Sequence, residues 1–143
     1  IQYAIEGLGI RDIIVMGHSK CGAIRGACDN IQLGNLSTLL NKIQPSLYLE
    51  RDTIENRTSA NPDFVYNVSH IQVRRSVEAV IERSVILREM VVKKEIGIIG
   101  AYYDVDNGSV EFMEDTFMSG ELRHLYLAVN GQTHRDEKEK AVI

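Results

Sequence analysis

The chain has 143 residues, of which 44% are hydrophobic and 25% are charged, a composition typical of one ordinary globular domain. Its net charge of −4 gives no electrostatic basis for binding nucleic acid or an anionic membrane surface, so we expect neither partner. No apolar run approaches the roughly 20 residues that are needed to cross a bilayer.

The first third of the chain combines helical patterns with one buried strand. A helical pattern opens the chain and stops at Gly9, and its apolar positions are Ile1, Ala4, Ile5 and Leu8. The apolar run over 12–16 predicts a buried strand, and 22–28 predicts a short helix. A longer helical stripe follows, in which Pro45 should kink or restart the helix; it consists of Leu36, Leu39, Leu40, Ile43 and Leu47.

The middle of the chain predicts a surface connection and then a long helix. Residues 51–63 are polar and contain Pro62, which is typical of a connection on the surface. A helical pattern then covers 64–91, with a possible break near Ser84. Most of its apolar face is formed by Val68, Ile71, Val77, Val80, Ile81, Leu87 and Met90.

The last part predicts a strand, a tight turn and a returning strand. A second buried strand falls within 95–104, Asp-Asn-Gly at 106–108 is a strong turn signal, and 110–113 alternates like a hairpin arm. Strand, helices and strand in this order favour parallel pairing. We therefore predict an α/β fold, a mainly parallel sheet flanked by helices with a C-terminal antiparallel hairpin strand, over 1–115, followed by a helix or charged tail over 116–143.

Two soft metal ligands lie where the first predicted strand ends. His18 and Cys21 are three residues apart, and the carboxyl edges of parallel strands are where such sheets place ligands. Imidazole nitrogen and thiolate sulfur are preferred zinc ligands, and Gly17 and Gly22 flank the pair. If Cys21 begins a helix, the helix dipole and Lys20 favour its thiolate. The spacing alone fits a packed free cysteine beside a turn histidine as well, so both interpretations stay open at this point.

The cysteines predict no disulfide framework. Cys21 and Cys28, the two cysteines of the chain, would lie about 10 Å apart on one helix, beyond the roughly 7 Å that a bridge allows. Reduced thiols indicate a reducing compartment, and we expect a cytoplasmic location.

Segment 17–23, Gly-His-Ser-Lys-Cys-Gly-Ala, resembles the second zinc-ligand motif of the β-class carbonic anhydrases. Residues 1–9 resemble the helix before that motif. Later segments are similar to the family's later helix and strand signatures, namely 67–68, 84–89 and 100–104 followed by Gly108. The resemblance covers roughly residues 1–115.

The resemblance implies a zinc enzyme that interconverts carbon dioxide and bicarbonate. His18 and Cys21 would be zinc ligands, and the region of Gly22 would border the substrate pocket. Zinc lowers the pKa of bound water to about 7, which supplies hydroxide for attack on carbon dioxide at neutral pH. Because family members are commonly dimers or larger, we expect a homodimer or a higher oligomer.

The chain departs from the family in one respect. The family takes its third ligand, a cysteine, and an Asp–Arg dyad near the metal from an upstream Cys-x-Asp-Ser-Arg segment, which these 143 residues do not contain. We expect this segment before Ile1, and we expect the present two-ligand chain to hold zinc weakly or to be metal-free and inactive. No spacing recommends the other possible ligands: Cys28, Asp29, His70 (expected on a helix surface), His124 and His134. The missing strand predicts an exposed sheet edge, and with it low stability or dependence on a partner chain.

Two other functions stay open. A non-catalytic carbonic-anhydrase-like binding or assembly module would explain the absence of the third ligand and the dyad. A redox-active thiol at Cys21 beside Lys20 is the last candidate, because it lacks a resolving cysteine at usable distance. Tyr102 and Tyr103 are expected to be core or interface residues rather than catalytic ones.

Overall fold

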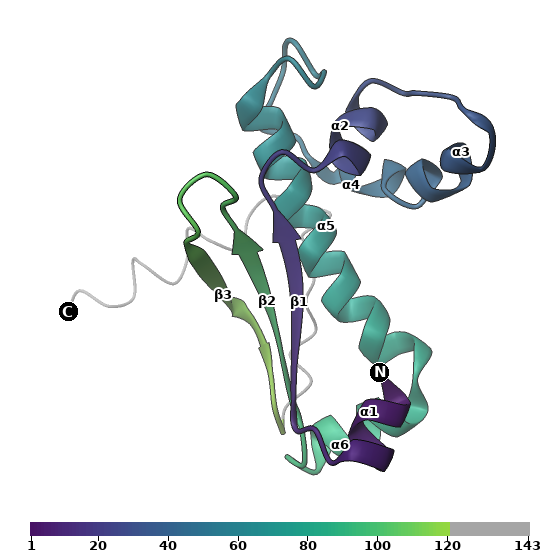
Figure 1. Ribbon diagram of the computed structural model, residues 1–143, viewed down its shortest axis with the longest axis vertical. Coiled ribbons are helices and arrows are strands. Elements are labelled where there is room, and N and C mark those ends of the chain that lie inside the picture. The colour runs from purple at the N-terminus through teal and green to yellow at the C-terminus, as the bar shows by residue number, and fades with distance from the viewer. Residues whose placement is uncertain (121–143) are drawn as a thin grey trace.

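A computed structural model describes residues 1–120, so most of the tail expected over 116–143, with His124 and His134, lies outside the described residues. Three strands form one sheet in the order β1-β2-β3 (Figure 1). β1 (Asp12–His18) runs parallel to β2 (Gly97–Tyr103), and β3 (Val110–Met118) returns antiparallel to β2. The helices are α1 (Gln2–Leu8), α2 (Gly22–Cys28), α3 (Gly34–Asn41), α4 (Gln44–Leu49), α5 (Pro62–Arg83) and α6 (Val85–Val92). The predicted α/β fold, with its parallel pair and C-terminal hairpin, is confirmed as a small mixed sheet flanked by helices.

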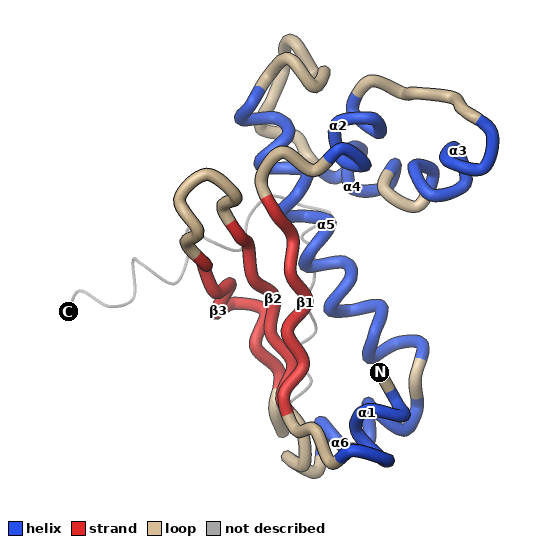
Figure 2. The backbone as a smooth tube through the Cα atoms, in the orientation of Figure 1, coloured by secondary structure: helices blue, strands red, loops and turns tan. Residues whose placement is uncertain are grey.

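The long helix α5 lies along one face of the sheet, and the short helices gather at its two ends (Figure 2). α2, α3 and α4 lie near the end of β1, while α1 and α6 lie near its beginning. One buried cluster joins α1, α5 and α6 to the sheet: Ile5, Val77, Ile81, Leu87, Val91, Ile96, Ile98 and Met118. A second lies among α2, α3, α5 and the start of α4: Ile24, Ala27, Cys28, Leu40, Ile43, Phe64 and Val68. The end of β1 therefore lies where the sheet meets the helices of the second cluster.

The boundaries of α5 follow from capping side chains. Asn61 caps its start, because its side-chain oxygen accepts hydrogen bonds from the backbone N–H groups of Asp63 (3.1 Å) and Phe64 (3.3 Å). Pro62 occupies the first turn, where its missing N–H costs nothing, so it starts the helix rather than only breaking the chain. Ser84 ends α5 in an extended conformation and caps α6 through its hydroxyl, which confirms the predicted break.

β3 is longer than the hairpin arm expected over 110–113. It continues to Met118, through the domain boundary expected at residue 115. Its register against β2 shifts between Ile98 and Gly100. The buried Thr116 hydroxyl holds this irregularity, because it accepts from the Gly100 N–H (2.7 Å) and donates to the Met113 carbonyl (2.6 Å).

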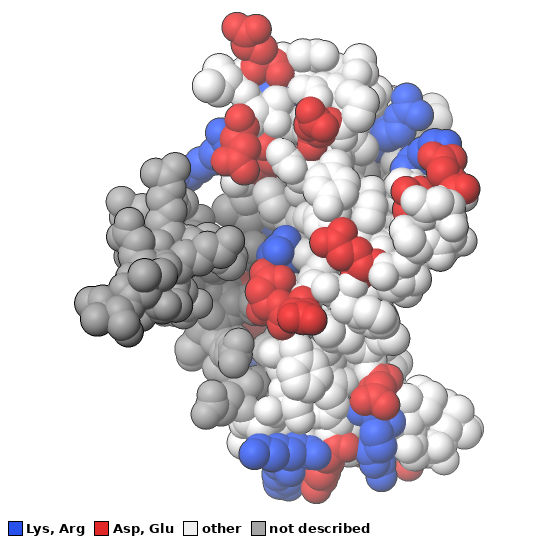
Figure 3. Space-filling view, turned by 90° about the vertical axis from the view of Figure 1, so that its left-hand side faces the viewer, with Lys and Arg blue, Asp and Glu red and all other residues white. Residues whose placement is uncertain are grey.

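The second face of the sheet is apolar and exposed. Half-exposed side chains project there from β1 and β3: Ile14, Met16, Val110, Phe112 and Phe117. Viewed from the side of β3, acidic side chains are scattered over the molecule, and basic ones gather at the end where α1 and α6 lie (Figure 3). Within residues 1–120, β1 has a strand partner along one edge only, in line with the exposed edge that the sequence predicts. No helix in this part of the chain is both long and apolar enough to cross a membrane.

We expect Gly100→Ala to destabilise the fold, because α5 passes closest to the sheet at glycines. A Cβ atom at Gly100 would lie 2.8 Å from Val73 Cγ1 and 3.0 Å from Thr116 Oγ1, so the helix or the strand would have to move. We expect a loss of about 2 kcal/mol in the free energy of unfolding, measured by urea titration. Val73→Ala should reduce the penalty of Gly100→Ala in a double-mutant cycle, and Gly22→Ala is the control, since nothing lies within 4 Å of its added Cβ. Equal losses from both glycine substitutions would contradict the close approach.

We expect Glu78 to make stability depend on pH. Burial, reinforced by the negative charge of Glu82, raises the pKa of the Glu78 carboxyl from its ordinary value of 4.5 to about 7. The folded protein therefore keeps this proton up to about pH 7, whereas the unfolded chain releases it near 4.5, and the free energy of unfolding falls as pH rises through this window. Because the side chain still reaches water, we expect Glu78→Gln to stabilise by about 1 kcal/mol near pH 8 and to change little near pH 4. Urea titrations across pH measure the difference; a constant difference would contradict the assignment.

Candidate metal centre

The turn between β1 and α2 brings the predicted ligands to one place. His18 is the last residue of β1, and Cys21 is the N-cap of α2. Lys20 between them adopts the left-handed conformation (φ 60°), which turns the chain sharply from strand to helix. Cys21 thus lies at the start of a helix, as the sequence predicts.

The imidazole of His18 is oriented by a hydrogen bond to its own loop. Its Nδ1 lies 2.8 Å from the backbone oxygen of Ser19. A carbonyl oxygen only accepts hydrogen bonds, so in the neutral form of the ring Nδ1 carries the proton and Nε2 has the lone pair. Metal-binding histidines in proteins commonly donate their second ring N–H in this way.

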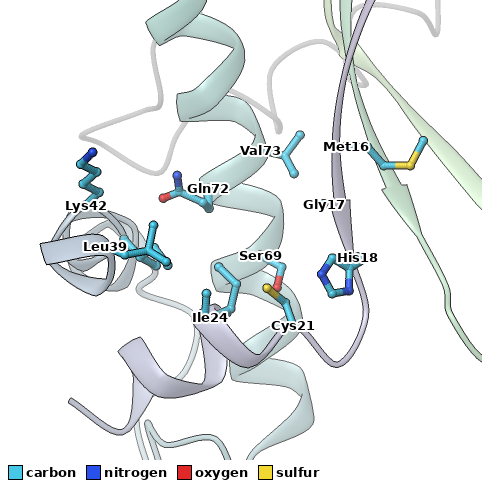
Figure 4. Close-up of a pocket in the computed structure, with 12 residues that line it drawn as sticks. Met16, Gly17, His18, Cys21, Ile24, Leu39, Lys42, Ser69, Gln72 and Val73 are labelled. Carbon is cyan, nitrogen blue, oxygen red and sulfur yellow. The ribbon is translucent and has the colours of Figure 1, made fainter. Parts of the chain in front are cut away.

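His18 and Cys21 line the same cavity, which has a volume of about 310 Å³ (Figure 4). It lies between the end of β1, the first turn of α2, the end of α3 and the middle of α5. Its wall is mainly apolar, with Ile24, Leu39 and Val73 among the lining residues and with polar groups from Ser69 and Gln72. Gly22 lies between two lining residues, Cys21 and Ala23, but is not itself part of the wall.

Within the described residues, no group of three His, Cys, Asp or Glu side chains could hold a metal ion. Cys28 is buried in the second core cluster, and burial, with the charge of Asp29, raises the pKa of its thiol to about 11, so it stays protonated. Asp29 accepts hydrogen bonds from the Ser59 N–H (2.8 Å) and hydroxyl (2.6 Å), which lower the pKa of its carboxyl. Both cysteines are free. Within the described residues, the cavity thus holds the predicted pair His18 and Cys21, two fewer than the four ligands that a tetrahedral zinc site takes.

The expectation that His70 lies on a helix surface is wrong. Its exposed fraction is 9%, because the hairpin of β2 and β3 covers this part of α5. The ring lies between Tyr66 and Tyr102, with centroid distances of 3.9 and 4.4 Å, and its Nδ1 bonds the Tyr66 backbone oxygen (2.9 Å). Tyr102 is buried, as expected of a core residue. A 3.6-residue period places an isolated polar residue on a face, but does not say what packs over that face.

The sequence interpretation missed the residues that support the ligand turn. Ser19 and Lys20, between the two ligands, both bond to the β2–β3 loop, at Asp104 and Asp106 respectively. The sequence did contain a signal for this contact, because Asp104 directly follows the second predicted strand. In a parallel pair the carboxyl ends of both strands lie side by side, so Asp104 should lie close to Ser19.

Comparisons with known proteins show the family of the chain. A family model described as carbonic anhydrase matches residues 1–110. A carbonic anhydrase of Synechococcus elongatus is 26% identical over 121 residues, which cover 77% of this chain and 41% of the relative. Carbonic anhydrase 2 of Mycobacterium tuberculosis is 27% identical over 113 residues, which cover 76% of this chain and 51% of the relative. The chain thus spans about half the length, or less, of these curated relatives.

Solved structures share the fold. One of two tetrameric β-carbonic anhydrases from Sordaria macrospora matches with a TM-score of 0.66 and 23% identity, over 78% of this chain and 56% of that one. A Coccomyxa β-carbonic anhydrase in complex with acetazolamide matches with a TM-score of 0.64 and 18% identity, over 78% and 50%. With the family match over residues 1–110, these likenesses show that the chain belongs to the β-class carbonic anhydrases.

Proposed function

We propose that the whole protein containing this chain catalyses the zinc-dependent reversible hydration of carbon dioxide to bicarbonate, with His18 Nε2 and Cys21 Sγ as two of the zinc ligands. The observation that carries the proposal is the turn at the end of β1. At this turn, the His18 imidazole, whose Nδ1 is bonded to the Ser19 carbonyl, lines a cavity. The thiol of Cys21, at the start of α2, lines the same cavity.

Each part of the cavity has a task in this proposal. A bound zinc ion would lower the pKa of water to about 7 and so supply the nucleophile. The Ser19 carbonyl holds the His18 ring, and Cys21 lies at the N-cap of α2, beside the same cavity. The apolar wall of Ile24, Leu39 and Val73 suits uncharged carbon dioxide, and the region of Gly22, between the lining residues Cys21 and Ala23, is proposed to border the substrate pocket.

The third ligand is proposed to come from a strand beside β1. A parallel strand along the free edge of β1 would end next to His18, because parallel strands end at the same edge of a sheet. A Cys-x-Asp-Ser-Arg segment at the end of that strand would add the cysteine ligand and the Asp–Arg dyad. With two ligands, the present chain should bind zinc weakly.

We also propose a homodimer or a higher oligomer and a cytoplasmic location. The exposed apolar face of the sheet supports self-association, and the Sordaria relative is described as tetrameric. Two free cysteines, one of them buried, suit a reducing compartment. Light scattering of the whole protein tests the assembly, and a monomer at micromolar concentration would contradict it.

Two measurements test the proposed reaction. Stopped-flow assays of the whole protein should show carbon dioxide hydration that is lost on chelation and restored by zinc. Zinc titration of the 143-residue chain should show weak binding that depends on Cys21; tight stoichiometric binding would contradict the two-ligand geometry. A zinc-free, inactive whole protein would instead favour the non-catalytic binding or assembly module.

A further inference from the structure

The two residues between the ligands are attached to a loop that lies far away in the sequence. The backbone N–H of Ser19 donates to the Tyr103 carbonyl (2.9 Å), one residue beyond the paired stretch of β1 and β2. The Ser19 hydroxyl donates to Asp104 Oδ1 (3.3 Å) and accepts from the Val105 N–H (2.9 Å). Ser19 is thus held by its backbone N–H and by its hydroxyl, which acts both as donor and as acceptor.

Asp104 is itself held by its own loop. Its Oδ1 accepts from the Asp106 N–H (2.8 Å), and its Oδ2 accepts from the Asn107 side-chain amide (3.1 Å). Its backbone bonds both Gly108 and Ser109 (2.9 Å each). The carboxylate is therefore a fixed acceptor, unlike the ion pair of Lys20 with Asp106, whose side chains are 61% and 62% exposed and which adds little.

The bonds that hold Ser19 also act on His18, the proposed ligand, through the Ser19 carbonyl. That carbonyl accepts the His18 Nδ1–H bond (2.8 Å), so a fixed Ser19 peptide fixes the orientation of the imidazole. The left-handed Lys20 that follows carries the chain on to Cys21. Asp104 to Ser19 to His18 is one continuous chain of contacts.

We propose that Ser19 and Asp104 are positioning residues of the metal centre, which hold His18 and Cys21 in the geometry of a metal site before the ion binds. This inference rests on the proposed function. Substitution of such supporting groups typically weakens metal affinity by 10–100-fold, so we expect about tenfold weaker binding for Ser19→Ala and for Asp104→Ala. Ser19→Thr keeps the hydroxyl and should restore most of the affinity.

Co²⁺ titration of the whole protein tests the inference, because a cobalt–thiolate bond gives a charge-transfer absorption band. Circular dichroism and the urea midpoint are measured on the same samples. Thr116→Val is the matched control: it removes a buried hydroxyl from the same hairpin, away from residues 104–109. It should lower the urea midpoint and leave Co²⁺ affinity within about twofold of wild type.

Weaker binding by Ser19→Ala and Asp104→Ala, rescue by Ser19→Thr and unchanged affinity of Thr116→Val would support positioning. Wild-type affinity of Ser19→Ala would overturn it, as would an affinity loss in Thr116→Val that matches its loss of stability. If the wild-type protein shows no charge-transfer band that depends on Cys21, the metal centre itself is wrong and the proposed function fails with it.

Discussion

Replacing His18 or Cys21 by alanine is expected to lower kcat/KM for carbon dioxide hydration by about a thousandfold or more in the whole protein, because each change would remove a proposed zinc ligand. His18 is exposed and Cys21 is partly exposed, so neither substitution opens a core cavity, and the urea midpoint should stay close to that of wild type. Zinc content after gel filtration and stopped-flow rates measure the two effects. Retention of both zinc and activity in either variant would refute the assignment of that residue.

Cys28→Ala is the matched control for the cysteine. This thiol is 7% exposed within the second core cluster, with a pKa raised to about 11, so it is a packing residue. Its replacement should cost about 1 kcal/mol of stability through a small cavity and leave zinc content unchanged. Loss of zinc from Cys28→Ala at retained fold would instead make Cys28 a ligand.

Arg57→Ala is expected to lower the free energy of unfolding by about 3–5 kcal/mol, the largest effect on stability that we predict, because it leaves the buried carboxylate of Glu50 without its counter-ion. Glu50 is 2% exposed, and Arg57 Nη1 lies 2.6 Å from its Oε2. The same guanidinium donates to the backbone oxygens of Leu47 (2.6 Å), Glu50 (2.9 Å) and Thr53 (2.7 Å). It also stacks over Phe64, 4.6 Å from the ring centroid.

Two variants separate charge from geometry at this site. Arg57→Lys keeps the positive charge but loses the fork that binds several acceptors, so it should fall between wild type and Arg57→Ala. Arg51→Ala removes an exposed arginine nearby and should change stability by less than about 0.5 kcal/mol. Urea titration measures all three, and equal losses from Arg51→Ala and Arg57→Ala would argue against the buried pair.

The secondary structure was predictable because local chemistry decides it. Gly9 adopts the left-handed conformation (φ 70°) at the end of α1, Pro45 lies in the first turn of the short α4, and Ser84 separates α5 from α6. Each of these residues starts or ends a helix through its own backbone conformation or a hydrogen bond to its near neighbours, so its effect can be predicted from the sequence. The connection over 51–63 was predicted as polar surface, but its Arg57 reaches back to Glu50, and no local pattern signals such a contact.

By itself, the sequence determined the family, and it singled out His18 and Cys21 as candidate ligands, because a strand that ends in a glycine-flanked His-x-x-Cys turn is a local pattern. Tertiary structure decided what surrounds the pair. The proposal of His18 Nε2 as ligand atom depends on the bond between His18 Nδ1 and the Ser19 carbonyl, and the Ser19 hydroxyl in turn bonds Asp104, 85 residues later in the chain. Likewise, His70 is buried because two strands from another part of the chain pack over α5. Such contacts join segments that only the folded sheet brings together, and sequence periodicity carries no information about them.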